Sequence, residues 1–201
     1  GHSNDGGAGI KEIINFNEAI AVAYEFYLAH PDETLIIVTA DHDTGGLTIG
    51  HSHSGYGGWI RNIEHQRISK DSFGDLCKSL LMSRRIFTWE DMKELLSDRL
   101  GFWSKINIPA DAEKALQEKF EDTFSGRNSK EEKTLYQSFN EFTVLVFKTM
   151  DAATGIDWTT TGHSGNPVPL FAIGVGADEF KTVHNNIDIP KTIRKIVEIE
   201  Q

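Results

Sequence analysis

Apolar positions in the first part of the chain follow a helical period and then become continuous. Between residues 10 and 30 they recur at steps of three, four and seven, which predicts one amphipathic helix. Pro31 ends this helix, because the residue before a proline disfavours helical backbone. Residues 35–40 then form a short, β-branched run without alternation, which is typical of a strand buried on both faces of a parallel sheet. This order of elements predicts an α/β fold.

The middle of the chain, residues 59–126, has the pattern of a helical insertion. Thr88 and Asp91 have the spacing of a capping box, and apolar residues at helical spacing follow them. Asp111 is the candidate cap of a second helix. Cys77 lies among leucines, and we expect it to be a buried helix residue.

The last third of the chain returns to an α/β pattern. Ser129 and Glu132 suggest another capping box, so we expect a helix over residues 129–150 that leads back to the sheet. A second buried strand is predicted over residues 168–176, and a final helix begins at Asp188.

These patterns predict two parts: residues 1–58 with 127–201 form the α/β domain, and residues 59–126 form the helical insertion.

Composition and charge limit the classes of function. The 201 residues carry 20 Lys and Arg against 30 Asp and Glu, which gives a net charge of −10 and argues against a nucleic-acid partner. The longest apolar stretches fall far short of the roughly 20 residues that cross a bilayer, so no membrane partner is expected. The single cysteine excludes an internal disulfide and a cysteine-based zinc cluster. A metal site would therefore use histidine and carboxylate ligands.

Four residues are candidate metal ligands: Asp41, His42, His163 and His2. Asp41 and His42 come where a strand ends, and ligands of open α/β sheets gather at such ends. Carboxylate and imidazole ligands suit zinc, although an adjacent Asp-His pair is more often a surface or capping pair. His163 stands in a glycine-flanked loop, where most histidines have no function, and the residues alone would place His2 in a frayed terminus.

Taken together, three segments resemble the alkaline phosphatase family. They occur in the family's order: Gly1-His2-Ser3-Asn4-Asp5, Thr39-Ala40-Asp41-His42-Asp43-Thr44-Gly45-Gly46 and Gly162-His163-Ser164-Gly165. The resemblance covers residues 1 to about 50 and about 140 to 198. It implies the C-terminal part of a three-layer α/β sandwich of the alkaline phosphatase type, in which the helical insertion forms a crown-like subdomain.

The resemblance also implies a two-zinc site and a neighbouring magnesium ion. It assigns Asp41 and His42 to one zinc and His2 and His163 to the other. Most magnesium ligands and the nucleophilic serine of the family lie in a segment upstream of residue 1. We therefore expect no catalytic residue in this chain and no activity of the isolated polypeptide. We also expect Asp41, His42 and His163 to converge in space, because the strands predicted at residues 35–40 and 170–174 are expected to share one sheet with the ligands at its rim.

The function implied is hydrolysis of small phosphate esters by a metal-dependent phosphomonoesterase. The alternatives are a phosphodiesterase or sulfatase of the same superfamily, or a metal-binding fragment without turnover. The resemblance implies a periplasmic or secreted protein and leaves a homodimer open. His51 and His53 are a further candidate metal or phosphate site, although such histidines usually belong to solvated loops.

Overall fold

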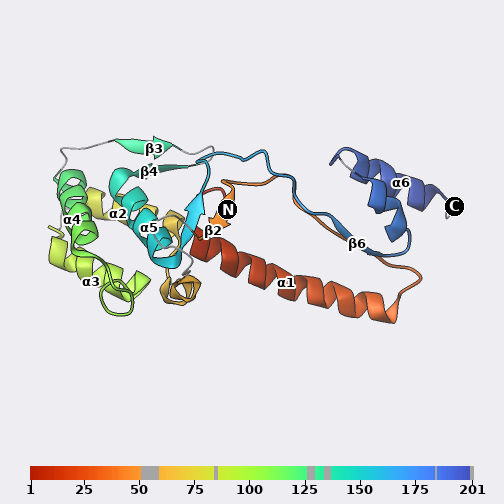
Figure 1. The fold of residues 1–201 in the computed structure, drawn as a ribbon, viewed down its shortest axis with the longest axis horizontal. Helices are drawn as coiled ribbons and strands as arrows, with labels where there is room; N and C mark the ends of the chain where they lie inside the picture. The colour runs from red at the N-terminus through yellow and green to blue at the C-terminus, as the bar shows by residue number, and fades with distance from the viewer. Residues whose placement is uncertain (51–58, 84–85, 126–129, 134–136, 184, 200–201) are drawn as a thin grey trace. The chain divides into compact units, whose positions relative to one another are not determined.

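The computed structural model describes residues 1–50, 59–83, 86–125, 130–133, 137–183 and 185–199 (Figure 1). The α-helices are α1 (Gly6–Ala29), α2 (Lys70–Met82), α3 (Trp89–Leu100), α4 (Ala110–Phe124), α5 (Glu141–Thr154) and α6 (Asp188–Ile199). The strands are β1 (Leu35–Val38), β2 (Leu47–Ile49), β3 (Glu131–Lys133), β4 (Ser138–Asn140), β5 (Ile156–Trp158) and β6 (Phe171–Gly174). Two short 3-10 helices are η1 (Ile60–His65) and η2 (Ala177–Thr182).

The chain forms two compact units. Unit 1 consists of Gly1–Lys11 and Thr44–Ser164, and unit 2 consists of Glu12–Asp43 and Gly165–Gln201. These units do not coincide with the predicted division, since unit 1 joins the expected insertion to chain segments on both sides of it. The predicted division itself stays a prediction.

Unit 1 is built around a core of aromatic and aliphatic side chains from α2, α3, α4 and α5. Phe73 on α2 lies between two rings of α5, with centroids 6.1 Å from Phe142 and 6.0 Å from Phe147. Phe120 on α4 reaches the same core, 5.6 Å from the ring of Phe142. Cys77 is fully buried here, as predicted.

Helix boundaries in unit 1 follow the sequence at some positions and depart from it at others. The capping box of Thr88 and Asp91 is confirmed, because each side chain accepts a hydrogen bond from the backbone N–H of the other residue. The prediction of Asp111 as a helix cap is wrong: α4 begins at Ala110, and Asp111 lies in its first turn.

The helix predicted over residues 129–150 was placed too early, because α5 begins at Glu141. Asn140 caps it, since the Asn140 side chain accepts a hydrogen bond of 2.7 Å from the backbone N–H of Thr143. Glu131–Lys133 instead pair in antiparallel register with Ser138–Asn140, so Glu132 belongs to a strand.

Unit 2 holds most of α1, the β1–β6 pair, η2 and α6. The helix predicted over residues 10–30 is confirmed as α1, but its expected buried apolar face is not, because Ile13, Ile14 and Leu28 are more than half exposed. Strands β1 and β6 pair with each other, as expected, from Leu35↔Gly174 to Val38↔Phe171. The expectation of a parallel, doubly buried sheet is wrong, because this pair is antiparallel and the residues of β1 are only half-buried. Among the described helices, none combines the length and apolar character needed to span a bilayer.

Candidate metal centre

A short antiparallel strand pair in unit 1 brings two of the predicted site segments together. β2 pairs with β5 from Leu47↔Trp158 to Ile49↔Ile156. Beyond this pair the two chains stay bonded, because Thr159 donates from its backbone N–H to the carbonyl of Gly45 at 2.9 Å. Ser164 likewise donates to the carbonyl of Thr44 at 2.6 Å. The segment that follows His42 is thereby fixed beside the segment that contains His163.

The glycines after Asp43 permit a third segment to approach. A Cβ atom at Gly45 would lie 2.2 Å from the side-chain oxygen of Asn4 and 2.7 Å from the carbonyl oxygen of Thr160, so a side chain does not fit there. The Asn4 side-chain nitrogen donates to that same Thr160 carbonyl at 2.7 Å. Asn4 has a left-handed φ of 51°, a conformation that Asn tolerates better than most residues. This contact draws the segment that carries His2 to the loop that carries His163.

The first residues of the chain are anchored, unlike the frayed terminus expected from the residues alone. Asp5 is 4% exposed, and its carboxylate accepts hydrogen bonds from the Ala8 backbone N–H, the Gln66 side chain and the Lys70 backbone N–H. The bond from Ala8 caps the N-terminus of α1. The Lys70 ammonium donates to the carbonyl of Ser3 at 2.9 Å. His2 therefore extends from a backbone that is held on the following three residues.

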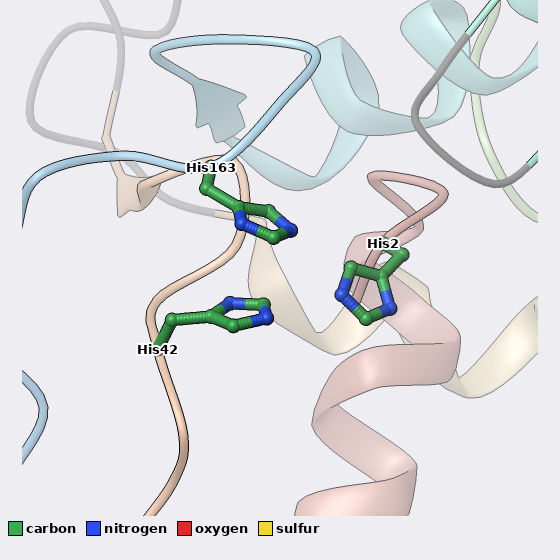
Figure 2. A group of neighbouring side chains, drawn as sticks. All are labelled: His2, His42 and His163. Atoms are coloured by element: carbon green, nitrogen blue, oxygen red, sulfur yellow. The ribbon is translucent and has the colours of Figure 1, made fainter. Parts of the chain in front are cut away.

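Two imidazoles of unit 1 converge at this point, because the ring centroids of His2 and His163 lie 5.4 Å apart. Figure 2 draws these two side chains together with that of His42, which Asp43 alone separates from Thr44 of unit 1. His2 and His163 come from positions far apart in the sequence.

Local contacts define which nitrogen of His42 can bind a metal. Its Nδ1 lies 2.7 Å from the carbonyl oxygen of Asp43, which can only accept a hydrogen bond, so Nδ1 carries the proton. The tautomer therefore presents Nε2 as the metal-binding atom. Asp41 places a carboxylate oxygen 3.3 Å from this Nε2, although its side chain is 83% exposed.

The imidazoles of His2 and His163 fit a borderline divalent ion. Imidazole nitrogen suits zinc, and catalytic zinc sites typically have three protein ligands and a further open position. A carbonyl that orients a ligand imidazole, as that of Asp43 does for His42, is the usual support of such ligands. The assignment of His2, Asp41, His42 and His163 as metal ligands stays a prediction.

A buried charge cluster lies under the segment that carries His2. Burial and the nearby charge of Asp5 raise the pKa of Asp151 to about 8, although the charge of Lys70 opposes the rise. Burial also lowers the pKa of Lys70. A cavity of about 660 Å³ reaches this cluster and is also lined by Asn4 and Thr160. The cavity therefore lies in unit 1 next to the loops of His2 and His163.

The sequence analysis did not identify Gln66, Lys70 or Asp151 as parts of the site. An Asx pair before a helix is a capping signal, and it could have identified Asp5. No local pattern marks Gln66 or Lys70, because their partners lie more than sixty residues away in the sequence. His51 and His53 fall outside the described residues.

Comparison with known proteins gives consistent results. The alkaline phosphatase family model matches residues 1–199. Alkaline phosphatase 4 of Bacillus subtilis is 27% identical over 197 residues, which are 98% of this chain and 36% of that protein. Alkaline phosphatase 3 of the same organism is 28% identical over 199 residues, 98% of this chain and 37% of that protein.

A solved structure is also similar. The cold-active alkaline phosphatase from a psychrophilic Shewanella species matches with a TM-score of 0.70 and 26% identity, over 96% of this chain and 41% of its own. This likeness confirms the predicted α/β fold. The chain spans little more than a third of the length of the two Bacillus relatives.

Proposed function

Because this chain belongs to the alkaline phosphatase family, we propose that it supplies metal ligands to a phosphomonoesterase that hydrolyses small phosphate esters. The observation that carries the proposal is the approach of His2 and His163, whose ring centroids lie 5.4 Å apart. Imidazole nitrogens that two distant segments bring to one point form a donor set that suits a divalent ion.

We propose that His2, Asp41, His42 and His163 are zinc ligands. In the two-zinc arrangement of the family, Asp41 and His42 serve one ion while His2 and His163 serve the other. The short separation between Asp41 and His42 Nε2 supports their sharing an ion. A bound divalent ion stabilises negative charge on phosphate oxygens and lowers the pKa of bound water. The ligands of the magnesium ion are proposed to lie mostly outside these residues.

The chain's own residues position this chemistry. The Asp43 carbonyl fixes the tautomer of His42, and the bond from Asn4 to Thr160 holds the loops of His2 and His163 together. The cavity beside Asn4 and Thr160 has room for the alcohol portion of a small ester. We assign the serine nucleophile to a segment outside the 201 residues, so the isolated chain binds metal without turnover. Location in the periplasm or outside the cell, and assembly as a homodimer, stay predictions.

Zinc binding by the 201-residue chain tests the metal site. We expect equilibrium dialysis or competition with a chromophoric chelator to show at most one zinc equivalent, because neither ion of the pair has more than two of its proposed ligands in this chain. His2→Ala and His163→Ala each remove an imidazole, and we expect each to weaken binding at least about tenfold, since loss even of an outer-shell partner costs about 10–100-fold. The matched control is His30→Ala, which removes an exposed histidine at the end of α1. Unchanged binding in His2→Ala and His163→Ala would contradict the site.

Activity assays on the same chain test whether the nucleophile lies outside the 201 residues. We expect no hydrolysis of an aryl phosphate, an aryl phosphodiester or an aryl sulfate at saturating zinc and magnesium. Turnover of the aryl phosphate would show that a nucleophile lies within these residues. Preferential turnover of the diester or the sulfate would favour the corresponding alternative function.

A further inference from the structure

The first residues of α2 form hydrogen bonds with Ser3 and Asp5, close to His2 in the sequence. The Lys70 ammonium donates to the carbonyl of Ser3, the residue next to His2, at 2.9 Å. Asp71 accepts a hydrogen bond of 2.5 Å from the Ser3 hydroxyl. The backbone N–H of Lys70 donates to Asp5 at 2.7 Å. Two consecutive residues of α2 therefore form three hydrogen bonds with Ser3 and Asp5.

Lys70 is an unusual choice for packing alone. It is only 5% exposed, and a buried ammonium is costly unless it is paired and hydrogen-bonded. Its ammonium also lies 4.9 Å from the ring centroid of Phe139, which provides a favourable contact. An apolar side chain would fill the volume and leave the buried Ser3 carbonyl without this donor. The hydrogen bond to the Ser3 carbonyl therefore offsets part of the free-energy cost of burying the Lys70 ammonium, and it fixes the position of the Ser3 backbone.

We propose that Lys70, with Asp71, is a positioning residue for His2, so that the helical insertion fixes the distance between His2 and His163. This inference rests on the proposed metal site. Lys70 acts on His2 through the Ser3 carbonyl. The role of the insertion is then to complete the metal centre rather than to cover it.

The test is zinc affinity in Lys70→Met, measured together with folding by circular dichroism. We expect zinc to bind about 10–100-fold more weakly, as when an outer-shell partner of a metal ligand is lost. Lys93→Met is the matched control, because Lys93 also lies 4.9 Å from an aromatic centroid, that of Trp103, and pairs with a carboxylate, that of Glu113. Lys93 lies on α3, away from residues 1–5 in sequence, and its loss is expected to leave zinc affinity within about twofold.

A double-mutant cycle separates positioning from general destabilisation. If Lys70 acts through His2, Lys70→Met has no further effect on zinc affinity in a His2→Ala background, because coupled residues are non-additive. Equal losses in the Lys70→Met and Lys93→Met variants, or additive losses in the double variant, would overturn the inference.

Zinc affinity in Asp71→Ala and in His2→Ala covers the case in which Lys70→Met does not fold and the case in which the metal site itself is wrong. Asp71→Ala removes one partly exposed hydrogen-bond acceptor, and we expect it to fold and to weaken zinc binding about two- to tenfold. If Lys70→Met does not fold, an unchanged affinity in Asp71→Ala overturns the inference. If His2→Ala itself leaves zinc binding unchanged, the proposed metal site is wrong and the inference falls with it. If His2→Ala weakens binding but Lys70→Met does not, only the positioning role is wrong.

Discussion

The two compact units bury their apolar side chains to very different extents. In unit 1, Phe73 and Phe142 are fully buried, and the aromatic rings of four helices contact one another. In unit 2, Phe180 is the one buried apolar side chain among the described residues. Ile13 and Val22 on α1 are 69% and 72% exposed. Unit 1 therefore has a core of its own, whereas unit 2 gains little stability from burial within the chain.

The exposed residues of α1 explain how this difference arises. Apolar side chains occur on several sides of the helix: Ile13, Ile14, Phe16, Val22, Phe26 and Leu28 are all more than half exposed. A helix that is hydrophobic on all sides is typical of a protein interior. The helical pattern of α1 therefore determines the helix, but it does not determine which surface covers the apolar side chains of the helix.

The largest expected effect comes from removing one ring from each unit. Phe142→Ala opens a cavity in the core of unit 1 and should lower the free energy of unfolding by about 3–5 kcal/mol. Phe16→Ala, at a side chain 52% exposed on α1, should change it by less than about 0.5 kcal/mol. Urea unfolding followed by tryptophan fluorescence and by circular dichroism measures both. Equal costs would show that the two units are buried alike, and the comparison would fail.

The next effect concerns the carboxyl of Asp151, which lines the cavity of unit 1. The pKa of Asp151 is about 8 in the folded chain and has the ordinary aspartate value of 3.8 in the unfolded chain, so the folded chain keeps a proton that the unfolded chain releases. Stability contributed by this proton is present at low pH and is lost as pH rises from about 4 to about 8.

Asp151→Asn replaces the protonated carboxyl with a neutral side chain of similar shape. We expect its gain in unfolding free energy over the wild type to grow from pH 5 to pH 9 by about 4 kcal/mol, because the range from pH 5 to the folded pKa of about 8 spans three pKa units of about 1.4 kcal/mol each. Asp157→Asn removes an exposed carboxylate nearby and controls for the loss of one charge. A gain for Asp151→Asn that is the same at both pH values would contradict the prediction.

The smallest effect compares helix starts in the two units. Thr88→Ala breaks the capping box of α3 and should cost about 1 kcal/mol of unfolding free energy. Asp188→Ala removes an exposed pair with Lys191 in the first turn of α6, where surface ion pairs contribute about 0–1 kcal/mol. Thermal unfolding of both variants should show a measurable shift in the midpoint only for Thr88→Ala. The reverse order would mean that α6 contributes more to stability than its exposure indicates.

Prediction from sequence succeeded where the signal was local. The period of α1, the capping box of Thr88 and Asp91, and the burial of Cys77 all depend on residues a few positions apart. It failed where pairing decided the outcome, because nothing local distinguishes a parallel partner for β1 from the antiparallel β6. The helix expected at Ser129 was likewise lost to the pairing of β3 with β4.

The candidate site divides in the same way. Asp41, His42, His163 and His2 were identified because their neighbours resemble family motifs, not because any one of them is distinctive alone. The residues that hold them could not be found like this. Lys70 and Gln66 bond residues more than sixty positions earlier, and Asn4 bonds Thr160, so these contacts exist only after the chain has folded.

Periodicity, capping and motifs lie in neighbouring residues, so α1, the start of α3, the family and the four candidate ligands could be predicted from the sequence. The anchoring of Asp5, the approach of His2 to His163 and the hydrogen bond from Lys70 to the Ser3 carbonyl depend on the folded chain. The physical reason is that convergence depends on hydrogen bonds between distant segments. Such bonds form only when the folded core brings the segments together, and no periodic pattern in the sequence predicts them.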